Sequence, residues 1–255
     1  MAIYAFSDAH GCWEPFQQLL EFIKPEDRVI CLGDCGDRGE DGWKIIETVL
    51  NDKRFIYLKG NHEDMLIKTI QAYRRFMISY QGVVNEDEIN FYLSMDSDYE
   101  LLYINGGCKT FKDWREAKER MVKYHLLNNL AYRAEYINKK GQKVILTHAG
   151  YTPKLNYTPD NDDLLWNRSH FMQTWDNNFP DVVIVHGHTP LMYMDEYLWE
   201  DCRDNDPNDV PGAYWYCNGH KVNIDRCTII TGELVLLNLD TWEEHIFKDD
   251  KIYCG

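Results

Sequence analysis

The sequence predicts an α/β fold in which helices cover a β-sheet and polar turns gather at one edge of that sheet. Three times in the first 77 residues, a short apolar run typical of a buried strand is followed by a segment whose apolar residues recur at helical spacing. A polar turn containing glycine stands between the strand and the helix of each unit. Ligands of such sheets collect at the carboxyl ends of the strands.

Each of the three units can be delimited in the sequence. The first has a strand at 2–6 and a helical face formed by Phe16, Leu19, Leu20 and Ile23. The second has a strand at 28–32 and a helical face formed by Trp43, Ile46 and Leu50. The third has a strand at 55–58 and a helical face formed by Leu66, Ile70, Tyr73 and Met77. We therefore expect the order βαβαβα.

The rest of the chain is predicted to add a helical cap, further strands and a long loop. Helical periodicity and many charges indicate a helical cap, or insertion, at about 66–140. Strands return at 144–146 and 182–185, each before a turn that contains histidine. A loop at about 191–221 is rich in Asp, Asn, Pro and Gly. Closing strands are expected at 222–224, 227–231 and 234–239. We expect residues 1–255 to form a single domain.

Charge and composition exclude several classes of protein. The 255 residues include 42 acidic and 27 basic side chains, so the formal net charge is −15. An acidic chain without a basic stripe repels nucleic-acid backbones and anionic membrane surfaces. No apolar run approaches the roughly 18 residues of a membrane span, and the N-terminus lacks export features, so we expect a cytoplasmic protein. The eight cysteines form no C-x-x-C pair, which argues against a zinc knuckle.

Five predicted strands end in residues of types that bind metal ions. In chain order these residues are Asp8 with His10, Asp34, Asn61, His148 and His188. A single histidine more often has a structural role, but chance does not readily place such residues after five strands. Oxygen and imidazole ligands without thiolates suit two divalent ions, of which we expect Mn²⁺ first, with Fe or Zn as alternatives. Asp34 is the natural bridge between the two ions.

The motifs that contain these residues resemble a known family. In order they are SDAHG, GDCGDRG, GNHE, THAG and GHTP, within residues 7–190. The set resembles the phosphoprotein phosphatases among the metallophosphoesterases, especially the serine/threonine protein phosphatases of bacteria and bacteriophages. Weaker matches are YINGGCKTF at 103–111, which resembles the NGG element of the bacterial members, and LLWNR at 164–168, which resembles their arginine-bearing tryptophan motif. The resemblance implies a calcineurin-like α/β fold, a sandwich of two β-sheets flanked by helices, with a helical cap.

The resemblance also implies a role for individual residues. The implied ligands are Asp8, His10 and Asp34 for one metal, and Asp34, Asn61, His148 and His188 for the other. The implied catalytic residues are His62 as general acid, Asp37 as the carboxylate that orients it, and Arg38 and Arg168 as phosphate clamps. A hydroxide bridging the two metals would then attack a phosphate ester in line, while His62 protonates the leaving oxygen.

Several positions depart from patterns found in this family or in broader metallophosphoesterases. Pro190 stands where broader metallophosphoesterases often carry a second ligand histidine, which favours the phosphoprotein phosphatase branch. Ser7 and Ala149 replace glycines, and Arg226 follows a segment that many members continue with Thr-Gly. None of these departures removes a ligand. We expect His186 to support the strand end rather than to bind a metal.

Three functions remain open at this point. The first is a protein phosphatase that acts on phosphoserine and phosphothreonine, with or without activity on phosphotyrosine. The second is a small-molecule hydrolase, such as a symmetrical dinucleoside tetraphosphate hydrolase, which shares nearly every motif. The third, a non-catalytic phosphate-binding module, would require a missing ligand or acid, and none is missing. The motifs do not separate the first two functions, whose substrates would meet the surfaces built by 66–140 and 191–221.

Overall fold

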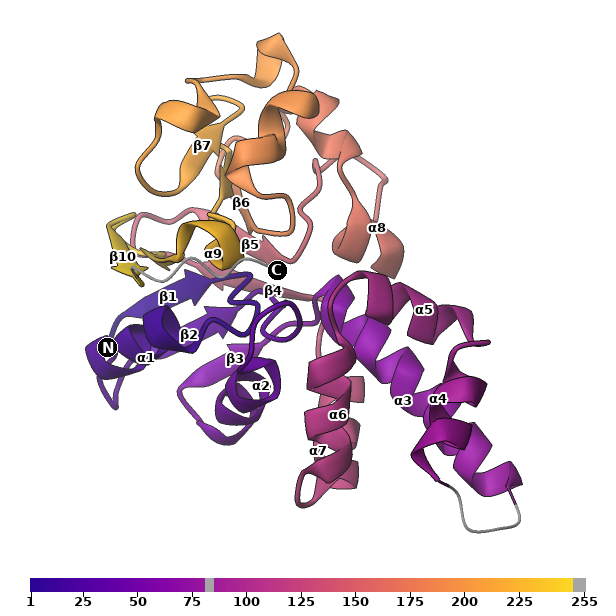
Figure 1. Cartoon of the computed structure of the whole chain (residues 1–255). Coiled ribbons are helices and arrows are strands. Elements are labelled where there is room, and N and C mark those ends of the chain that lie inside the picture. Colours follow the sequence, from indigo (N-terminus) through magenta and orange to yellow (C-terminus); the bar gives the residue numbers. More distant parts are fainter. Residues whose placement is uncertain (81–84, 250–255) are drawn as a thin grey trace.

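Two five-stranded β-sheets packed face to face form the centre of the protein (Figure 1). This computed structural model describes residues 1–80 and 85–249. Residues 81–84 of the predicted cap, and Cys254 among the cysteines, lie outside the described residues. The α/β fold, the two-sheet sandwich and the flanking helices are confirmed.

The first sheet has the strand order β10-β9-β1-β2-β3. Its strands are β1 (Ile3–Phe6), β2 (Arg28–Cys31), β3 (Phe55–Tyr57), β9 (Glu233–Asn238) and β10 (Glu244–Lys248). Strands β1, β2 and β3 are parallel, and β9 and β10 run antiparallel beside them. Successive side chains of a strand point to opposite faces, so Phe6 packs among the helices while its neighbour Ala5 packs against the second sheet.

The second sheet has the strand order β4-β5-β6-β8-β7. Its strands are β4 (Arg133–Ile137), β5 (Lys143–Thr147), β6 (Val182–His186), β7 (Tyr214–Tyr216) and β8 (Lys221–Asn223). Strands β5, β6 and β8 are parallel, and the edge strands β4 and β7 are antiparallel to their neighbours. Both sheets therefore have parallel central strands whose carboxyl ends can hold a shared site.

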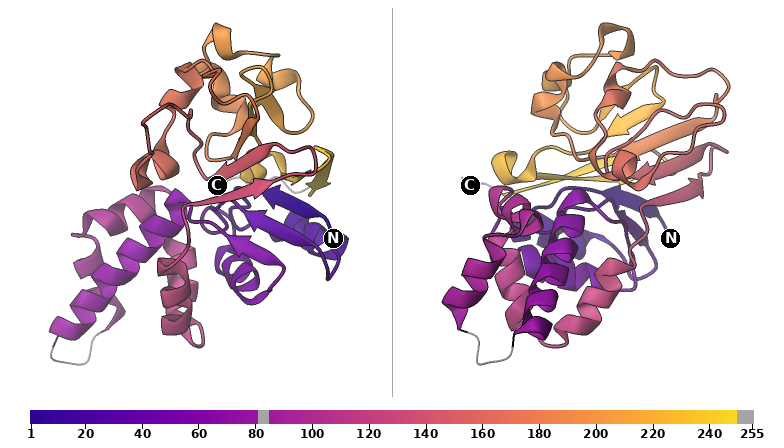
Figure 2. Two further views of the ribbon diagram at one scale, coloured as in Figure 1. Left: turned by 180° about the vertical axis from the view of Figure 1, so that it is seen from behind. Right: turned by 90° about the vertical axis from the view of Figure 1, so that its right-hand side faces the viewer.

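Helices cover the outer face of the first sheet and extend to one side of it. The α-helices are α1 (Trp13–Phe22), α2 (Gly42–Asn51), α3 (Asn61–Ser79), α4 (Glu86–Leu93), α5 (Ser97–Ile104), α6 (Cys108–Glu116), α7 (Arg120–Asn128), α8 (Asn161–Trp166) and α9 (Thr228–Thr231). Short 3₁₀ helices occur at Ser169–Met172, Leu191–Glu196, Glu200–Cys202 and Pro207–Asp209. Figure 2 shows α3 to α7 as one group that projects away from the sheets. No described helix is both long and apolar enough to cross a membrane.

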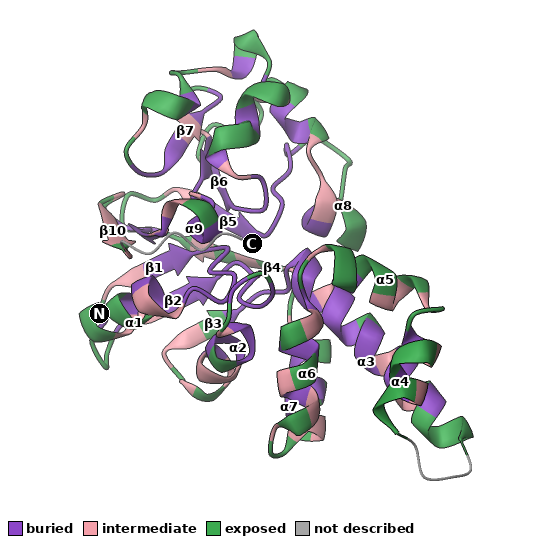
Figure 3. Cartoon of the chain, viewed as in Figure 1, coloured by how far each residue is buried: buried purple, intermediate pink, exposed green. Residues whose placement is uncertain are grey.

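The core between the sheets is formed by aliphatic side chains from both. Ala5 and Ile30 of the first sheet meet Leu146 and Val185 of the second, and each is no more than 4% exposed. The central strands are accordingly buried along most of their length (Figure 3). Because the two sheets cannot slide without exposing this layer, the turns at their rims have a fixed relation to each other.

Several predicted elements were wrong in type or extent. The predicted strand at 227–231 is instead the short helix α9 at 228–231, since Cys227 and Gly232 both adopt left-handed backbone angles that stop an extended strand at each end. Residues 133–137 of the predicted cap form β4, and residues 214–216 of the predicted loop form β7. Strand β10 was not predicted. The ligand residues also follow strands of two sheets, not of one sheet.

Candidate metal centre and active site

The turns after β1, β2, β3, β5 and β6 meet at one rim of the sandwich and bring the predicted ligands together. Backbone hydrogen bonds join the turns to one another, from His10 N to Asp34 O at 3.0 Å and from Gly187 N to His148 O at 2.9 Å. A Cβ on Gly33 would lie 2.5 Å from the backbone of Gly60, so the β2 and β3 turns approach each other at a distance that only glycine permits.

Strained backbone is concentrated in these turns. Positive φ angles occur at Asp8 (54°), His10 (43°), Asp34 (55°) and His188 (68°), none of which is glycine. A side chain in this left-handed region costs about 1–3 kcal/mol and persists only where the surroundings fix it, which is common at functional sites. Four predicted ligands in this conformation point to turns shaped by function.

Four of the predicted ligands, Asn61, His148, His188 and Asp34, form one group. Asn61 Oδ1 lies 2.7 Å from His148 Nε2 and 2.9 Å from His188 Nδ1, and these two ring nitrogens are 3.2 Å apart. The carboxylate of Asp34 approaches His148 Nε2 to 3.3 Å. Ligand atoms about 2.1 Å from a common ion lie about 3 Å from each other, so this arrangement fits the second predicted metal position.

The second group of side chains shares Asp34 with the first. Asp34 Oδ2 lies 3.8 Å from His10 Nε2 and 3.8 Å from His62 Nε2. Asp8 lies beside this group, with Oδ1 3.8 Å from His10 Nε2, while its Oδ2 accepts hydrogen bonds from Ser7 and from the backbone of His188. Asp34 is thus the carboxylate common to both groups, as the sequence predicts for a bridging ligand.

The chemistry of this donor set fits two divalent cations. The six predicted ligands are no more than 7% exposed, and they include two carboxylates. Buried carboxylates are stable only when they are paired or bind a metal. The other ring nitrogens of His10 and His148 are held by the carbonyl oxygens of Gly36 and Leu32, which is the arrangement that orients a metal-binding imidazole.

The pKa values of the group reflect the same electrostatics. Burial lowers the pKa of His10 and of His188 well below the usual histidine value, so both rings are neutral and available as ligands. Burial also acts to lower the pKa of His148, but the carboxylates of Asp34, Asp8 and Glu63 together outweigh it and raise that pKa to about 9. Burial would raise the pKa of Asp34, yet the neighbouring imidazoles, His148 first, hold it well below its usual value.

Beside the metal-binding group lie His62, Asp37 and Arg38. His62 Nδ1 is 2.8 Å from Asp37 Oδ2, and Arg38 Nη2 is 3.2 Å from His62 Nε2. Asp37 and His62 are buried, whereas Arg38 is exposed at the rim. An imidazole held by a carboxylate on one nitrogen can exchange a proton through the other, and an exposed arginine beside it can bind a phosphate.

Two further residues considered in the sequence, Arg168 and His186, make contacts of their own. The guanidinium of Arg168 lies 5.7 Å above the ring of Tyr197, and Trp166, from the same motif, meets His188 edge to face at 6.0 Å. His186 is buried and its Nε2 lies 2.7 Å from the hydroxyl of Tyr216, which fits the expected supporting role.

The structure also places Arg226, the position where the sequence departs from the family pattern. Its guanidinium binds Glu233 at 2.8 Å and the carbonyl oxygen of Val210 at 2.9 Å. This arginine therefore joins the start of β9 to the loop that precedes β7.

Two buried acids of the site were not predicted. Glu63 accepts hydrogen bonds from the backbone amides of Asp34, Cys35 and Gly60 and from the hydroxyl of Tyr57. In the sequence, its role was signalled by its position at the end of the GNHE motif, in the first turn of α3.

The second unpredicted acid, Asp225, accepts a hydrogen bond from Cys227 N at 2.8 Å. Burial, followed by the charge of Asp8, raises its pKa well above the usual carboxyl value. An acid directly after the predicted strand at 222–224 was the signal for it.

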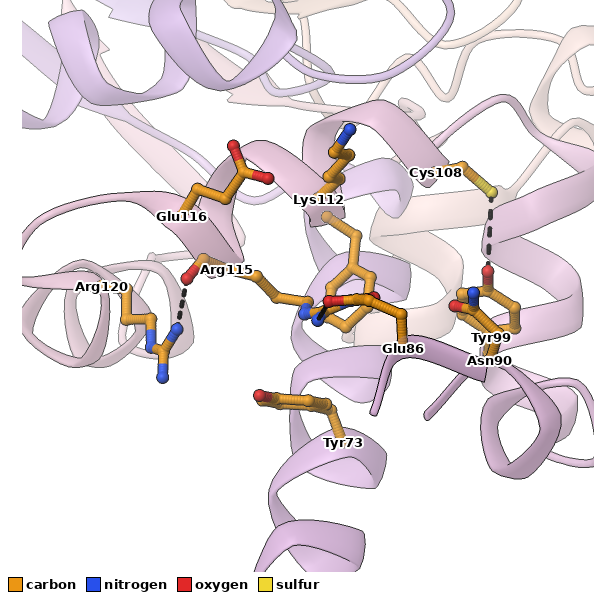
Figure 4. A pocket seen from close by; sticks show the side chains of 10 residues that line it. Tyr73, Glu86, Asn90, Tyr99, Cys108, Lys112, Arg115, Glu116 and Arg120 are labelled. Atoms are coloured by element: carbon orange, nitrogen blue, oxygen red, sulfur yellow. Dashed lines mark hydrogen bonds and ion pairs between the residues drawn. The ribbon is translucent and has the colours of Figure 1, made fainter. Parts of the chain in front are cut away.

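A cavity of about 750 Å³ lies among α3, α4, α5 and α6, apart from the metal-binding group (Figure 4). Its wall includes Tyr73, Tyr99 and Arg115, and Arg115 forms an ion pair with Glu86 at 2.5 Å. None of the predicted site residues lines it.

A comparison with protein families identifies the family to which the chain belongs. A family model described as calcineurin-like phosphoesterase matches residues 1–223, which include all five motifs. The chain belongs to the calcineurin-like phosphoesterase family. Members of this family use a dinuclear divalent metal centre, which agrees with the two overlapping groups around Asp34.

Curated relatives of this phosphoesterase carry the names of nucleotide hydrolases. It is 28% identical over 158 residues to a symmetrical bis(5′-nucleosyl)-tetraphosphatase of Buchnera aphidicola, covering 60% of this chain and 46% of that protein. It is 24% identical over 253 residues to an asymmetrical bis(5′-nucleosyl)-tetraphosphatase, PrpE, of Bacillus mycoides, covering 89% and 86%. The phosphoesterase thus spans about half the length of the first relative.

Solved structures support the fold. A putative diadenosine tetraphosphatase superposes with a TM-score of 0.60 at 14% identity, covering 96% of this chain and 92% of the other. A serine/threonine phosphatase of Saccharomyces cerevisiae superposes with a TM-score of 0.54 at 11% identity, covering 98% and 81%. At such low identity, the likeness concerns the architecture of the phosphoesterase only.

Proposed function

We propose that this phosphoesterase hydrolyses dinucleoside tetraphosphates with the help of two divalent metal ions. The observation that carries the hydrolytic chemistry is the position of Asp34, whose carboxylate is common to the His10 group and to the group of His148 and His188. The substrate class is supported by the names of the curated relatives, one of which aligns over nearly the whole chain. This proposal replaces protein phosphatase activity as the leading function.

The residues around Asp34 have separable tasks in this reaction. Asp8, His10 and Asp34 would hold one ion, and Asp34, Asn61, His148 and His188 the other. Bound there, the two ions would supply positive charge for the phosphoryl oxygens and would acidify a water molecule. Arg38 stands at the rim, where its planar guanidinium can bind two oxygens of a phosphate group. Glu63 holds the backbone amides of the Asp34 turn and so fixes the bridging carboxylate.

A second candidate function is hydrolysis of phosphoserine and phosphothreonine in proteins. The pair of His62 and Asp37, with its 2.8 Å contact, favours it. An alkoxide leaving group needs a proton much more than a nucleoside diphosphate does, because the alkoxide is far more basic. A buried, oriented imidazole is the group that can supply that proton.

The test is a parallel assay of the Mn²⁺-loaded protein on diadenosine tetraphosphate and on a phosphoserine peptide, with chelated protein as the control. We expect rapid, metal-dependent cleavage of the dinucleotide, and chromatography of the products tells two nucleoside diphosphates from a monophosphate with a triphosphate. Cleavage of the peptide alone would replace the first candidate by the second. Cleavage of neither substrate would overturn both.

A further inference from the structure

The turn formed by Asp37 and Arg38 adopts a backbone conformation that it cannot hold by itself. Both residues have left-handed φ angles, 68° and 64°, and neither is glycine. Two consecutive side-chain-bearing residues in this region are costly, so outside contacts must stabilise the turn. The carboxylate that contacts His62 and the guanidinium at the rim both depend on this turn.

The contacts that stabilise the turn come from the junction between α5 and α6. The amide of Asp37 donates to the hydroxyl oxygen of Thr110 at 2.9 Å. The amide of Arg38 donates to the carbonyl oxygen of Gly106 at 3.0 Å. Thr110 is 1% exposed, so the hydrogen bond with Asp37 is shielded from water.

Gly107 brings the same junction against the side chain of Asp37. A Cβ on Gly107 would lie 2.8 Å from Asp37 Oδ2, which is the oxygen that contacts His62 Nδ1. A side chain at 107 would clash first with Leu102 and then with the Asp37 carboxylate that contacts His62. Two hydrogen bonds, to Thr110 and to Gly106, thus hold the backbone of the turn formed by Asp37 and Arg38, and Gly107 leaves room beside its carboxylate.

We propose that Thr110 is a positioning residue for the phosphoester reaction, whose hydroxyl sets the place of Asp37 and Arg38. The proposal rests on the proposed function and deepens it, since it concerns the same site. Without the hydroxyl, the buried amide of Asp37 loses its acceptor and the turn relaxes from its left-handed conformation. The Asp37 carboxylate then leaves His62, and the Arg38 guanidinium leaves the position where it meets a phosphate.

The test compares three variants of the Mn²⁺-loaded protein. Thr110→Val keeps the shape and removes the acceptor, and Thr110→Ser keeps the acceptor. Thr69→Val is the matched control, because Thr69 is a fully buried threonine of α3 whose hydroxyl binds Asp98 O at 3.3 Å, away from the turn. Thr110→Ala serves in place of Thr110→Val if the valine variant does not fold.

The substrates separate positioning from a loss of stability. On a phosphoserine peptide, whose leaving group is poor, we expect Thr110→Val to lose about ten- to hundredfold in kcat, since displacements near 1 Å cost about that much. On 4-nitrophenyl phosphate the kcat should fall less than threefold. Calorimetry should show inorganic phosphate bound about tenfold more weakly. Thr110→Ser should behave like the unaltered protein on all three measurements.

Phosphate affinity decides the matter even if the protein cleaves neither ester, because this measurement needs no turnover. If Thr110→Val matches Thr69→Val in kcat on both esters and in phosphate affinity, Thr110 is merely structural and the proposal is overturned. Equal losses by Thr110→Val and Thr110→Ser overturn it as well, because the hydroxyl would then not matter. Failure to cleave diadenosine tetraphosphate would remove the proposed substrate only, since neither ester nor inorganic phosphate depends on it.

Discussion

His62 Nδ1 lies 2.8 Å from Asp37 Oδ2, and neither side chain is more than 2% exposed. Burial acts to lower the pKa of His62, but the carboxylates of Asp34 and Asp37 outweigh it and raise the pKa above the usual value. More of the imidazole therefore carries a proton near neutral pH, although the Arg38 guanidinium beside Nε2, which can only donate, opposes this shift. This is the protonation state that a general acid needs.

The first prediction concerns this acid. His62→Asn should lose on the order of 10²–10⁴ in kcat on a phosphoserine peptide, the usual scale of general acid catalysis, and much less on 4-nitrophenyl phosphate. Asp37→Asn should show the same pattern more mildly, because it only orients the ring. Steady-state kinetics and metal analysis check both. Equal losses on both esters with a lost metal would make His62 a ligand instead.

The second prediction concerns the bridging carboxylate. Asp34→Asn should be the most damaging ligand substitution, because Asp34 belongs to both groups and its loss weakens both ions together. Metal analysis after gel filtration should find less than one ion per chain. Asp41→Asn, at a partly exposed acid that pairs with Lys44 at 3.7 Å, is the control and should keep two ions. Two ions retained in Asp34→Asn would refute the bridge.

The third prediction follows from the pKa of about 9 at His148 in the metal-free protein. At pH 7 this imidazole is protonated, whereas a metal needs it neutral, so binding must release about one proton. Apparent metal affinity should rise about tenfold per pH unit between pH 7 and 8.5 and level off near 9. Calorimetry in buffers of different ionisation enthalpy measures the released proton. A pH-independent affinity over this range would contradict the prediction.

The fourth prediction separates the two arginines. Arg38→Ala should weaken phosphate binding and lower kcat/KM by about tenfold to hundredfold while two metals stay bound, because charged hydrogen bonds contribute about 1.5–3 kcal/mol. Arg168→Ala should have a smaller effect, since its guanidinium also packs over Tyr197. Inhibition by inorganic phosphate provides the measurement. If Arg168→Ala leaves inhibition and rate unchanged, that arginine has a structural role only.

The strands that carry the ligands were predictable because of where they lie in the sheets. Strands such as β2 and β6 are buried on both faces and give continuous apolar runs in the sequence. The strands that were missed, β4, β7 and β10, lie at sheet edges in the described structure. Strand β4 alternates exposed and half-buried residues over only five positions and has no buried residue, and β7 has only three residues within a polar segment, so both are too short and too weakly apolar to stand out in the sequence.

The predicted site residues were recognisable because each ligand type follows a strand within a short motif. The contacts of Glu63 and Thr110 were not predicted, because each binds backbone amides far away in the chain, Asp34 and Cys35 for Glu63 and Asp37 for Thr110. Thr110 contacts a residue 73 positions earlier, and no local pattern of α6 marks such a contact. The strained φ angles of Asp37 and Arg38, which demand these partners, are properties of the folded turn only.

The last prediction concerns Glu63, whose two carboxylate oxygens accept four hydrogen bonds. Oε2 accepts from the amides of Asp34 at 2.7 Å and Gly60 at 2.9 Å, and Oε1 accepts from Cys35 N at 3.0 Å and from the hydroxyl of Tyr57 at 2.7 Å. All four partners donate. Glu63→Gln must therefore turn an NH₂ group toward two donors, which leaves buried groups unpaired.

We expect Glu63→Gln to lower the free energy of unfolding of the chelated protein by about 2–4 kcal/mol. It should also weaken metal binding, because the amide of Asp34 is no longer fixed and the bridging carboxylate moves with it. Tyr57→Phe removes only one of the four donors and is the matched control, with an expected loss of about 1 kcal/mol and two metals retained. Urea unfolding and metal analysis measure both effects. Should Glu63→Gln unfold at the same urea concentration as Tyr57→Phe and keep both ions, the turn that carries Asp34 would be stabilised by something other than this acid.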